Sequence, residues 1–179
     1  MSGNIKNTPV KGIAAGLALT AGATLLLEMS LTRIFSITMW YHYAFMAISI
    51  ALFGLSFGAV LVYIKSSWFP QEKISERLAQ LSLAYMLAIL VCFWLHLQIP
   101  FTPTFTLVGV GSVVLSFLLV AIPFLISGVI VCLSLTRFTE NIGRIYAFDL
   151  AGAAAGSMLL PLLVRPLTGP GVVISSAFL

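Results

Sequence analysis

Five long apolar runs, separated by short polar segments, constrain this chain more than any other feature of its sequence. A helix crosses the roughly 30 Å hydrocarbon core of a bilayer in about 20 residues, because each residue advances it by about 1.5 Å. The five runs are long enough to cross, and they occupy residues 12–31, 43–64, 78–97, 106–135 and 145–164. The sequence therefore predicts an all-α, polytopic transmembrane helical bundle that forms a single domain over residues 1–179.

The charge content supports a lipid-facing surface. The chain is 60% hydrophobic and only 8% charged, whereas about a quarter of the residues in a soluble domain are charged. So few charges do not hydrate the surface of a folded soluble protein, and we therefore expect the lipid bilayer to be the main partner. The net charge of +4 does not indicate a nucleic-acid partner, because the basic residues form neither a run nor a stripe.

The number of predicted spans depends on how two segments are interpreted. The fourth run contains Pro123, and we interpret it as one tilted, kinked helix because neither half is long enough to cross. A Gly169-Pro170-Gly171 turn precedes the last apolar segment, residues 171–179. That segment reaches about 13 Å as a helix, less than half of the hydrocarbon core. We expect it to be the start of a truncated sixth span, and the chain to be a fragment.

The distribution of Lys and Arg predicts the orientation. One side of the predicted bundle holds seven of these residues, Lys6, Lys11, Lys65, Lys73, Arg77, Arg137 and Arg144, and the other holds two, Arg33 and Arg165. Short loops rich in Lys and Arg stay in the cytoplasm during insertion. The N-terminus is therefore predicted to be cytoplasmic.

Glycines at four-residue spacing predict where helices approach each other closely. The pairs are Gly12 with Gly16, Gly54 with Gly58, and Gly152 with Gly156. Helices in lipid associate through close backbone packing, which small residues permit. We interpret the pairs as packing within one chain rather than as a dimer site. The two cysteines, Cys92 and Cys132, lie in separate spans at different expected depths, so no disulfide is predicted.

Asp149 is an ionisable residue inside the fifth run, roughly 7 Å along the helix from Arg144. Such a residue is expected to point into the bundle. One interpretation is a contact to a substrate, an ion or a cytoplasmic domain. The other, which we prefer from sequence alone, is a structural interaction with Tyr146, Arg137 or Arg144 that holds the fifth helix in place.

A second polar group is expected near the opposite membrane face. Glu28, Arg33, His42 and His96 lie at similar predicted depths and are expected to converge there. Two histidines on different helices can ligate a haem or a metal, but interfacial histidines are more often hydrogen-bonded beside aromatic residues such as Trp40. No catalytic, cofactor-binding or metal-ligating residue is assigned, because no phosphate-binding loop, nucleophile elbow or Cys-x-x-Cys motif is present.

Several segments form a pattern that resembles a known family. They are EMSLTRIFS at 28–36, WYHYAF at 40–45, ISIALFGLSFGA at 48–59, IPF at 122–124 and RIYAFDLAGAAAG at 144–156. The pattern resembles the N-terminal membrane domain of bacterial integral-membrane spermidine synthase-like proteins. Its most specific part is residues 28–58.

The resemblance implies that a cytoplasmic Rossmann-like domain follows the membrane domain in the same parent chain. That domain resembles aminopropyltransferases and S-adenosylmethionine-dependent methyltransferases, and none of it lies within residues 1–179. The implied location is a bacterial inner (plasma) membrane. The implied cofactor of the parent is S-adenosylmethionine or its decarboxylated form, with no cofactor in this chain. Fold-level resemblance does not establish a reaction.

Two other functions stay open from the sequence. The chain is compatible with half of a small-molecule transporter, although its predicted midplane is small and apolar. It is also compatible with a haem- or quinone-linked membrane redox subunit that uses His42 and His96.

Overall fold

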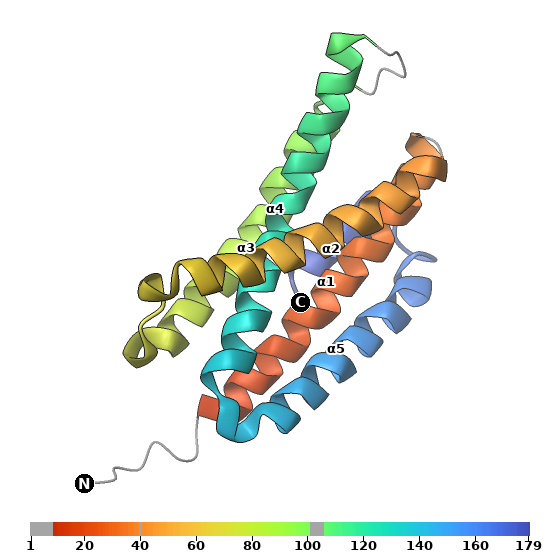
Figure 1. The fold of residues 1–179 in the computed structure, drawn as a ribbon. Coiled ribbons are helices and arrows are strands. Elements are labelled where there is room, and N and C mark those ends of the chain that lie inside the picture. The colour runs from red at the N-terminus through yellow and green to blue at the C-terminus, as the bar shows by residue number, and fades with distance from the viewer. Residues whose placement is uncertain (1–8, 40, 101–105) are drawn as a thin grey trace, which may run out of the picture.

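The computed structural model describes residues 9–39, 41–100 and 106–179, and every regular element in these ranges is a helix (Figure 1). The long helices are α1 (Pro9–Thr38), α2 (Tyr41–Ile64), α3 (Ile74–Leu97), α4 (Leu107–Arg137) and α5 (Ile142–Leu163). Each of these five is long and apolar enough to cross a membrane, which confirms the predicted all-α class with five candidate spans. The short helices are η1 (Ser66–Trp68), η2 (Gln71–Lys73), η3 (Thr139–Asn141) and α6 (Gly169–Ala177).

Helix α1 is the centre of the bundle. It packs along α5 and also contacts α2, α4 and α6 (Figure 1). On its other side, α4 packs along α2 and α3. The short helix α6 lies against α1 and α3, where Val172 and Val173 are fully buried. The fold is therefore built from two closely packed pairs, α1 with α5 and α2 with α4, that share contacts through α1.

Helix α1 continues well past the predicted end of the first span at Leu31. The reason is a buried face that repeats every four residues, since Leu31, Phe35 and Met39 are all in the core. The polar residues of this segment do not interrupt the helix. Thr32, for example, donates its hydroxyl to the backbone carbonyl of Glu28 at 2.8 Å. Packing of the apolar face thus extends a helix that polarity alone suggested would end.

Glycines bring α2 and α4 into backbone contact. A Cβ built on Gly54 would lie 2.7 Å from the Cβ of Phe124, and one on Gly58 would overlap the α4 backbone. On α4, a Cβ on Gly128 would overlap the carbonyl of Leu55. The predicted packing role of Gly54 and Gly58 therefore agrees with the structure, and Gly128 is a third glycine of the same contact.

Helices α1 and α5 approach each other equally closely. A Cβ on Gly152 would overlap the backbone of Ala18, and one on Gly156 would overlap the backbone of Gly22. A Cβ on Gly22 would in turn lie 2.9 Å from the carbonyl oxygen of Gly152. Small residues at four-residue spacing on both helices thus form this contact.

The prediction that Gly12 and Gly16 form a third packing pair is wrong. Within the part of the chain that the structure describes, a Cβ on either glycine meets no atom within 4 Å. The small-residue face of α1 that packs on α5 begins later, at Ala18. Spacing alone does not reveal which of several small faces meets a neighbouring helix.

Pro123 does not break α4, and the two cysteines are not paired with each other. Pro123 is buried inside α4, which is one helix through this position as predicted. Cys92 and Cys132 are free thiols, and Cys132 lies 3.9 Å from the carbonyl oxygen of Ala59 on α2.

Candidate functional site

A cluster of three hydroxyl groups joins three helices inside the bundle. Thr24 of α1 lies 2.9 Å from the hydroxyl of Tyr85 on α3 and 2.7 Å from that of Ser127 on α4. Thr24 donates its own proton to the carbonyl of Thr20 at 2.7 Å. A threonine hydroxyl has one proton and two lone pairs, so Tyr85 and Ser127 are the donors of the other two bonds. The cluster is buried and its hydroxyl protons are all used.

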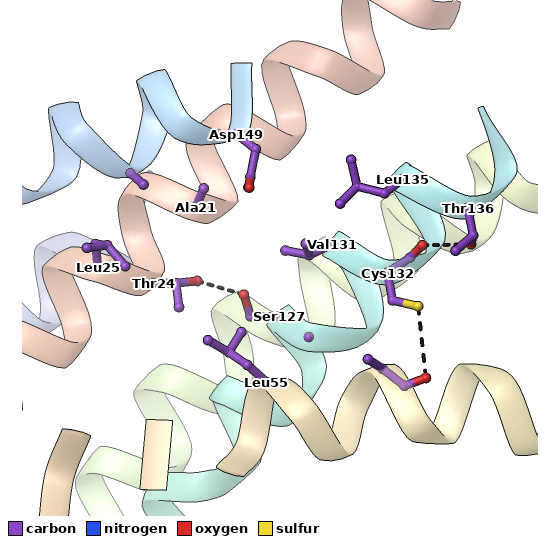
Figure 2. Close-up of a pocket in the computed structure, with 13 residues that line it drawn as sticks. Ala21, Thr24, Leu25, Leu55, Ser127, Val131, Cys132, Leu135, Thr136 and Asp149 are labelled. Carbon is purple, nitrogen blue, oxygen red and sulfur yellow. Dashed lines mark hydrogen bonds between the residues drawn. The ribbon is translucent and has the colours of Figure 1, made fainter. Parts of the chain in front are cut away.

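A cavity of about 450 Å³ lies beside this cluster (Figure 2). Helices α1, α2, α4 and α5 all contribute to its lining. Most of the lining is apolar, as with Leu25, Leu55 and Val131. The polar groups around it are Thr24, Ser127, Cys132, Thr136 and Asp149. Cavities of roughly 300–1,000 Å³ with an apolar lining and few polar groups are the usual form of small-molecule sites.

The packing of the helices explains why a cavity forms there. Helix α5 packs along α1 but makes few contacts with α4, while α2 packs along α4. The space between α5 and the α2–α4 pair is therefore left unfilled, with α1 behind it. Small side chains at the lining, such as Ala21, Ala59 and Ala153, keep this space open. Because α5 makes few contacts with α4, this side of the cavity is only partly closed.

Asp149 points from α5 toward the cavity and α4 (Figure 2). Its side chain is half-buried, and no hydrogen bond or ion pair joins it to any residue that the structure describes. The structural interpretation expected an interaction with Tyr146, Arg137 or Arg144, and none of these residues bonds to it here. Tyr146 is instead half exposed on the outside of α5. Asp149 thus lines the cavity without the structural partner that was preferred from sequence alone.

The expected convergence of Glu28, Arg33, His42 and His96 does not take the predicted form. Glu28 is half-buried, Arg33 and His42 are exposed, and His96 is buried. No hydrogen bond or ion pair among the described residues joins the side chains of Glu28 and Arg33 to each other or to His96. Trp40, named with this group, lies outside the described residues.

His96 is enclosed by aromatic rings. Its ring centroid lies 5.2 Å from that of Phe35 and 6.5 Å from that of Phe93. Its Nδ1 is buried without a hydrogen-bond partner in the described structure. The described part of the chain contains no group of three or more His, Cys, Asp or Glu side chains placed to hold a metal ion. The surroundings of His96 are thus those of a packed core residue.

The hydroxyl cluster was not predicted from the sequence. Thr24, Tyr85 and Ser127 are far apart along the chain, and each is an ordinary polar residue in an apolar run. The available signal is weak: hydroxyl side chains in transmembrane helices commonly bond across helices. A hydroxyl side chain bonds to another helix only if its own helix is rotated so that the side chain faces that helix. This rotation is set by the packing of the whole bundle.

The helices and this interior define a class of protein, a helical bundle with five candidate membrane spans and a largely apolar cavity beside a buried hydroxyl cluster. Comparison of the chain with protein families, with curated proteins and with solved structures found no match.

Proposed function

We propose that this chain is the membrane-embedded N-terminal domain of a spermidine synthase-like protein and anchors a cytoplasmic transferase domain of the same parent chain. The observation that carries the proposal is the position of the segments that resemble that family. Residues 48–59 contain Gly54 and Gly58, and residues 144–156 contain Gly152 and Gly156. These four glycines are among the positions where helices approach each other most closely.

A role in anchoring agrees with the interior of the bundle. The closest helix–helix contacts are made at glycines, and the core around them consists of apolar side chains. The described residues supply no Gly-rich strand–turn–helix unit that would cradle an adenosyl cofactor. In this proposal S-adenosylmethionine or its decarboxylated form binds to the parent's transferase domain, and the membrane domain binds neither.

The proposal also places the chain in a bacterial inner membrane with its N-terminus in the cytoplasm. The positions of the basic residues support this orientation. Lys11 is in the first turn of α1, Lys65 follows α2, Lys73 precedes α3 and Arg137 ends α4. These helix ends lie on the same side of an antiparallel bundle, where positive charge marks the cytoplasmic face. We further propose that α6 continues as a sixth span in the parent.

The reading frame beyond Leu179 and a binding measurement test the proposal together. We expect a downstream glycine-rich β-strand–helix pattern followed by acidic residues, as an adenosyl-binding domain requires. Calorimetry is then done on the parent protein and on residues 1–179, with both cofactors. Binding by the parent alone supports the proposal. Binding by residues 1–179 places the cofactor site in the membrane domain, and no binding by the parent removes the family assignment.

Transport of a small molecule is the second candidate, and the cavity is the observation that favours it. The cavity lies among four helices and contains an unpaired carboxylate. A further six-span block after Leu179, in place of a cofactor-binding domain, would favour this candidate. The redox alternative requires His42 and His96 to hold a group between them, and the enclosure of His96 by Phe35 and Phe93 gives it no support.

A further inference from the structure

The polar side chains around the cavity are almost all hydrogen-bonded within the protein. The hydroxyl of Thr24 donates to Thr20, and that of Ser127 is used in the bond to Thr24. Thr136 donates its hydroxyl to the carbonyl of Cys132 at 2.7 Å. The thiol of Cys132 is directed at the carbonyl of Ala59. The side-chain donors of the lining are therefore already used within the protein.

Asp149 is the exception among these polar groups. A carboxylate is an acceptor with two oxygens, and no described residue donates to this one. An ionised carboxylate at this depth is costly unless a cation or hydrogen-bond donors compensate it. The cavity therefore offers a ligand one strong acceptor and no free side-chain donor. That combination selects a head group that donates, above all a cationic one, and disfavours an anion.

The rest of the lining determines the body of the ligand. Leu25 and Leu55 line the cavity beside the hydroxyl cluster, and Val131 and Leu135 line it on the side of Asp149 (Figure 2). The volume of about 450 Å³ accommodates one alkyl chain rather than a two-chain phospholipid. The cavity is bounded by α5 on one side and by α2 and α4 on the other, and α5 packs far less closely on α4 than on α1. A ligand dissolved in the bilayer can therefore enter from the side.

We propose that this cavity binds a single-chain amphiphile whose cationic head group pairs with the carboxylate of Asp149. The alkyl chain lies along α1 and α4 toward Thr24 and Ser127. This site does not depend on a transferase domain, so it stands or falls separately from the proposed anchoring function.

The test uses a decylamine that carries a photoreactive diazirine on its chain, with the full chain in phosphatidylcholine nanodiscs. After irradiation, mass spectrometry locates the labelled peptides. We expect labels on the segments of α4 and α5 that line the cavity. Unlabelled decylamine should compete about tenfold better than decanol, because both head groups can donate a hydrogen bond to Asp149 but only the ammonium adds an ion pair to it. Decanoic acid should compete least.

Two matched pairs of variants decide the role of the site. Asp149→Asn should bring decylamine and decanol to nearly equal competition, whereas Glu140→Gln, in the exposed helix η3, should keep the preference. Ala153→Leu fills the cavity and should abolish labelling there, whereas Ala154→Leu, exposed on the same helix, should not. Each variant is first checked for an unchanged thermal unfolding temperature. If Asp149→Asn does not fold, the alanine pair still decides the question.

Three results would contradict the proposed binding of a cationic amphiphile in this cavity. Equal competition by decylamine, decanol and decanoic acid in the unmodified protein would mean that the cavity selects no head group. A preference for decylamine that survives in Asp149→Asn would place the cationic head elsewhere. Equal labelling of Ala153→Leu and Ala154→Leu would show that the probe sits outside the cavity. Any of these results overturns the proposal.

Discussion

Thr24 and Ser127 are 103 residues apart in the chain, yet their side-chain oxygens lie 2.7 Å apart in the middle of the bundle. Tyr85 reaches the same threonine from a third helix at 2.9 Å. The cluster restricts the rotation of α1 relative to α3 and α4. Thr24 can bond to both Tyr85 and Ser127 only when all three helices turn these side chains toward one another. It also forms one boundary of the cavity that Asp149 faces.

Replacing Thr24 with valine should destabilise the bundle by about 1–2 kcal/mol. Two interhelical hydrogen bonds are lost, each worth about 0.6 kcal/mol on average in membrane proteins, and the hydroxyl of Tyr85 is left buried without a partner. Valine keeps the shape of threonine, so packing is preserved. Unfolding in mild detergent, followed by circular dichroism, measures the loss.

The control for this prediction is Thr38→Val. Thr38 is exposed and bonds only to the carbonyl of Ile34 in its own helix, so its replacement should change stability by less than about 0.5 kcal/mol. A double-mutant cycle with Ser127→Ala should show coupling between Thr24 and Ser127. Additive losses in that cycle would mean that the bond contributes nothing to stability.

Gly156→Ala should reduce the stability of the bundle although it adds only one methyl group. The added methyl group would overlap the backbone of Gly22, and backbone cannot move aside as a flexible side chain can. Overpacking of this kind typically costs about 1–3 kcal/mol, and Gly156→Leu should be worse. Gly16→Ala is the matched control, since its methyl group meets open space and alanine favours a helix over glycine. Equal thermal stability of the two alanine variants would show that α1 and α5 do not pack as described.

His96→Phe should fold with unchanged or slightly increased stability. The ring already packs against Phe35 and Phe93, and phenylalanine removes the buried Nδ1 that has no partner among the described residues. His96→Ala should instead lose about 2–4 kcal/mol through the cavity it leaves. A marked loss of stability in His96→Phe would reveal a polar partner or a bound group at this histidine.

The architecture was largely predictable, because the length and hydropathy of the five runs follow directly from the thickness of a bilayer. The helix ends were less predictable. The first apolar run predicts a span that ends near Leu31, whereas the buried residues Phe35 and Met39 continue the packed face of the helix. Only the neighbouring helices show that these positions are buried. The sequence also does not show which glycine pairs contact a neighbouring helix. Gly54 and Gly58 pack closely against α4, whereas Gly12 and Gly16 meet no neighbouring helix in the described part of the chain.

The candidate site was only partly predictable. Asp149 stands out in the sequence as a charge inside an apolar run, and the prediction that it points into the bundle agrees with its position beside the cavity. Whether it bonds to Tyr146 or faces open space depends on the angle between α5 and α4, which no local pattern encodes. The partners of Thr24 were hidden for the same reason, because Tyr85 and Ser127 are brought to it by tertiary packing.

The most direct test of the account is the sidedness of single cysteines in a variant that lacks Cys92 and Cys132. Ser75 lies in the first turn of α3 and Gln98 follows its end, and both residues are exposed. A bundle of five spans with a cytoplasmic N-terminus predicts that a cysteine at Ser75 is protected from a membrane-impermeant maleimide in intact cells, and that one at Gln98 reacts. The reverse pattern would contradict the orientation. Reaction of both cysteines, or of neither, would contradict the crossing of the membrane by α3.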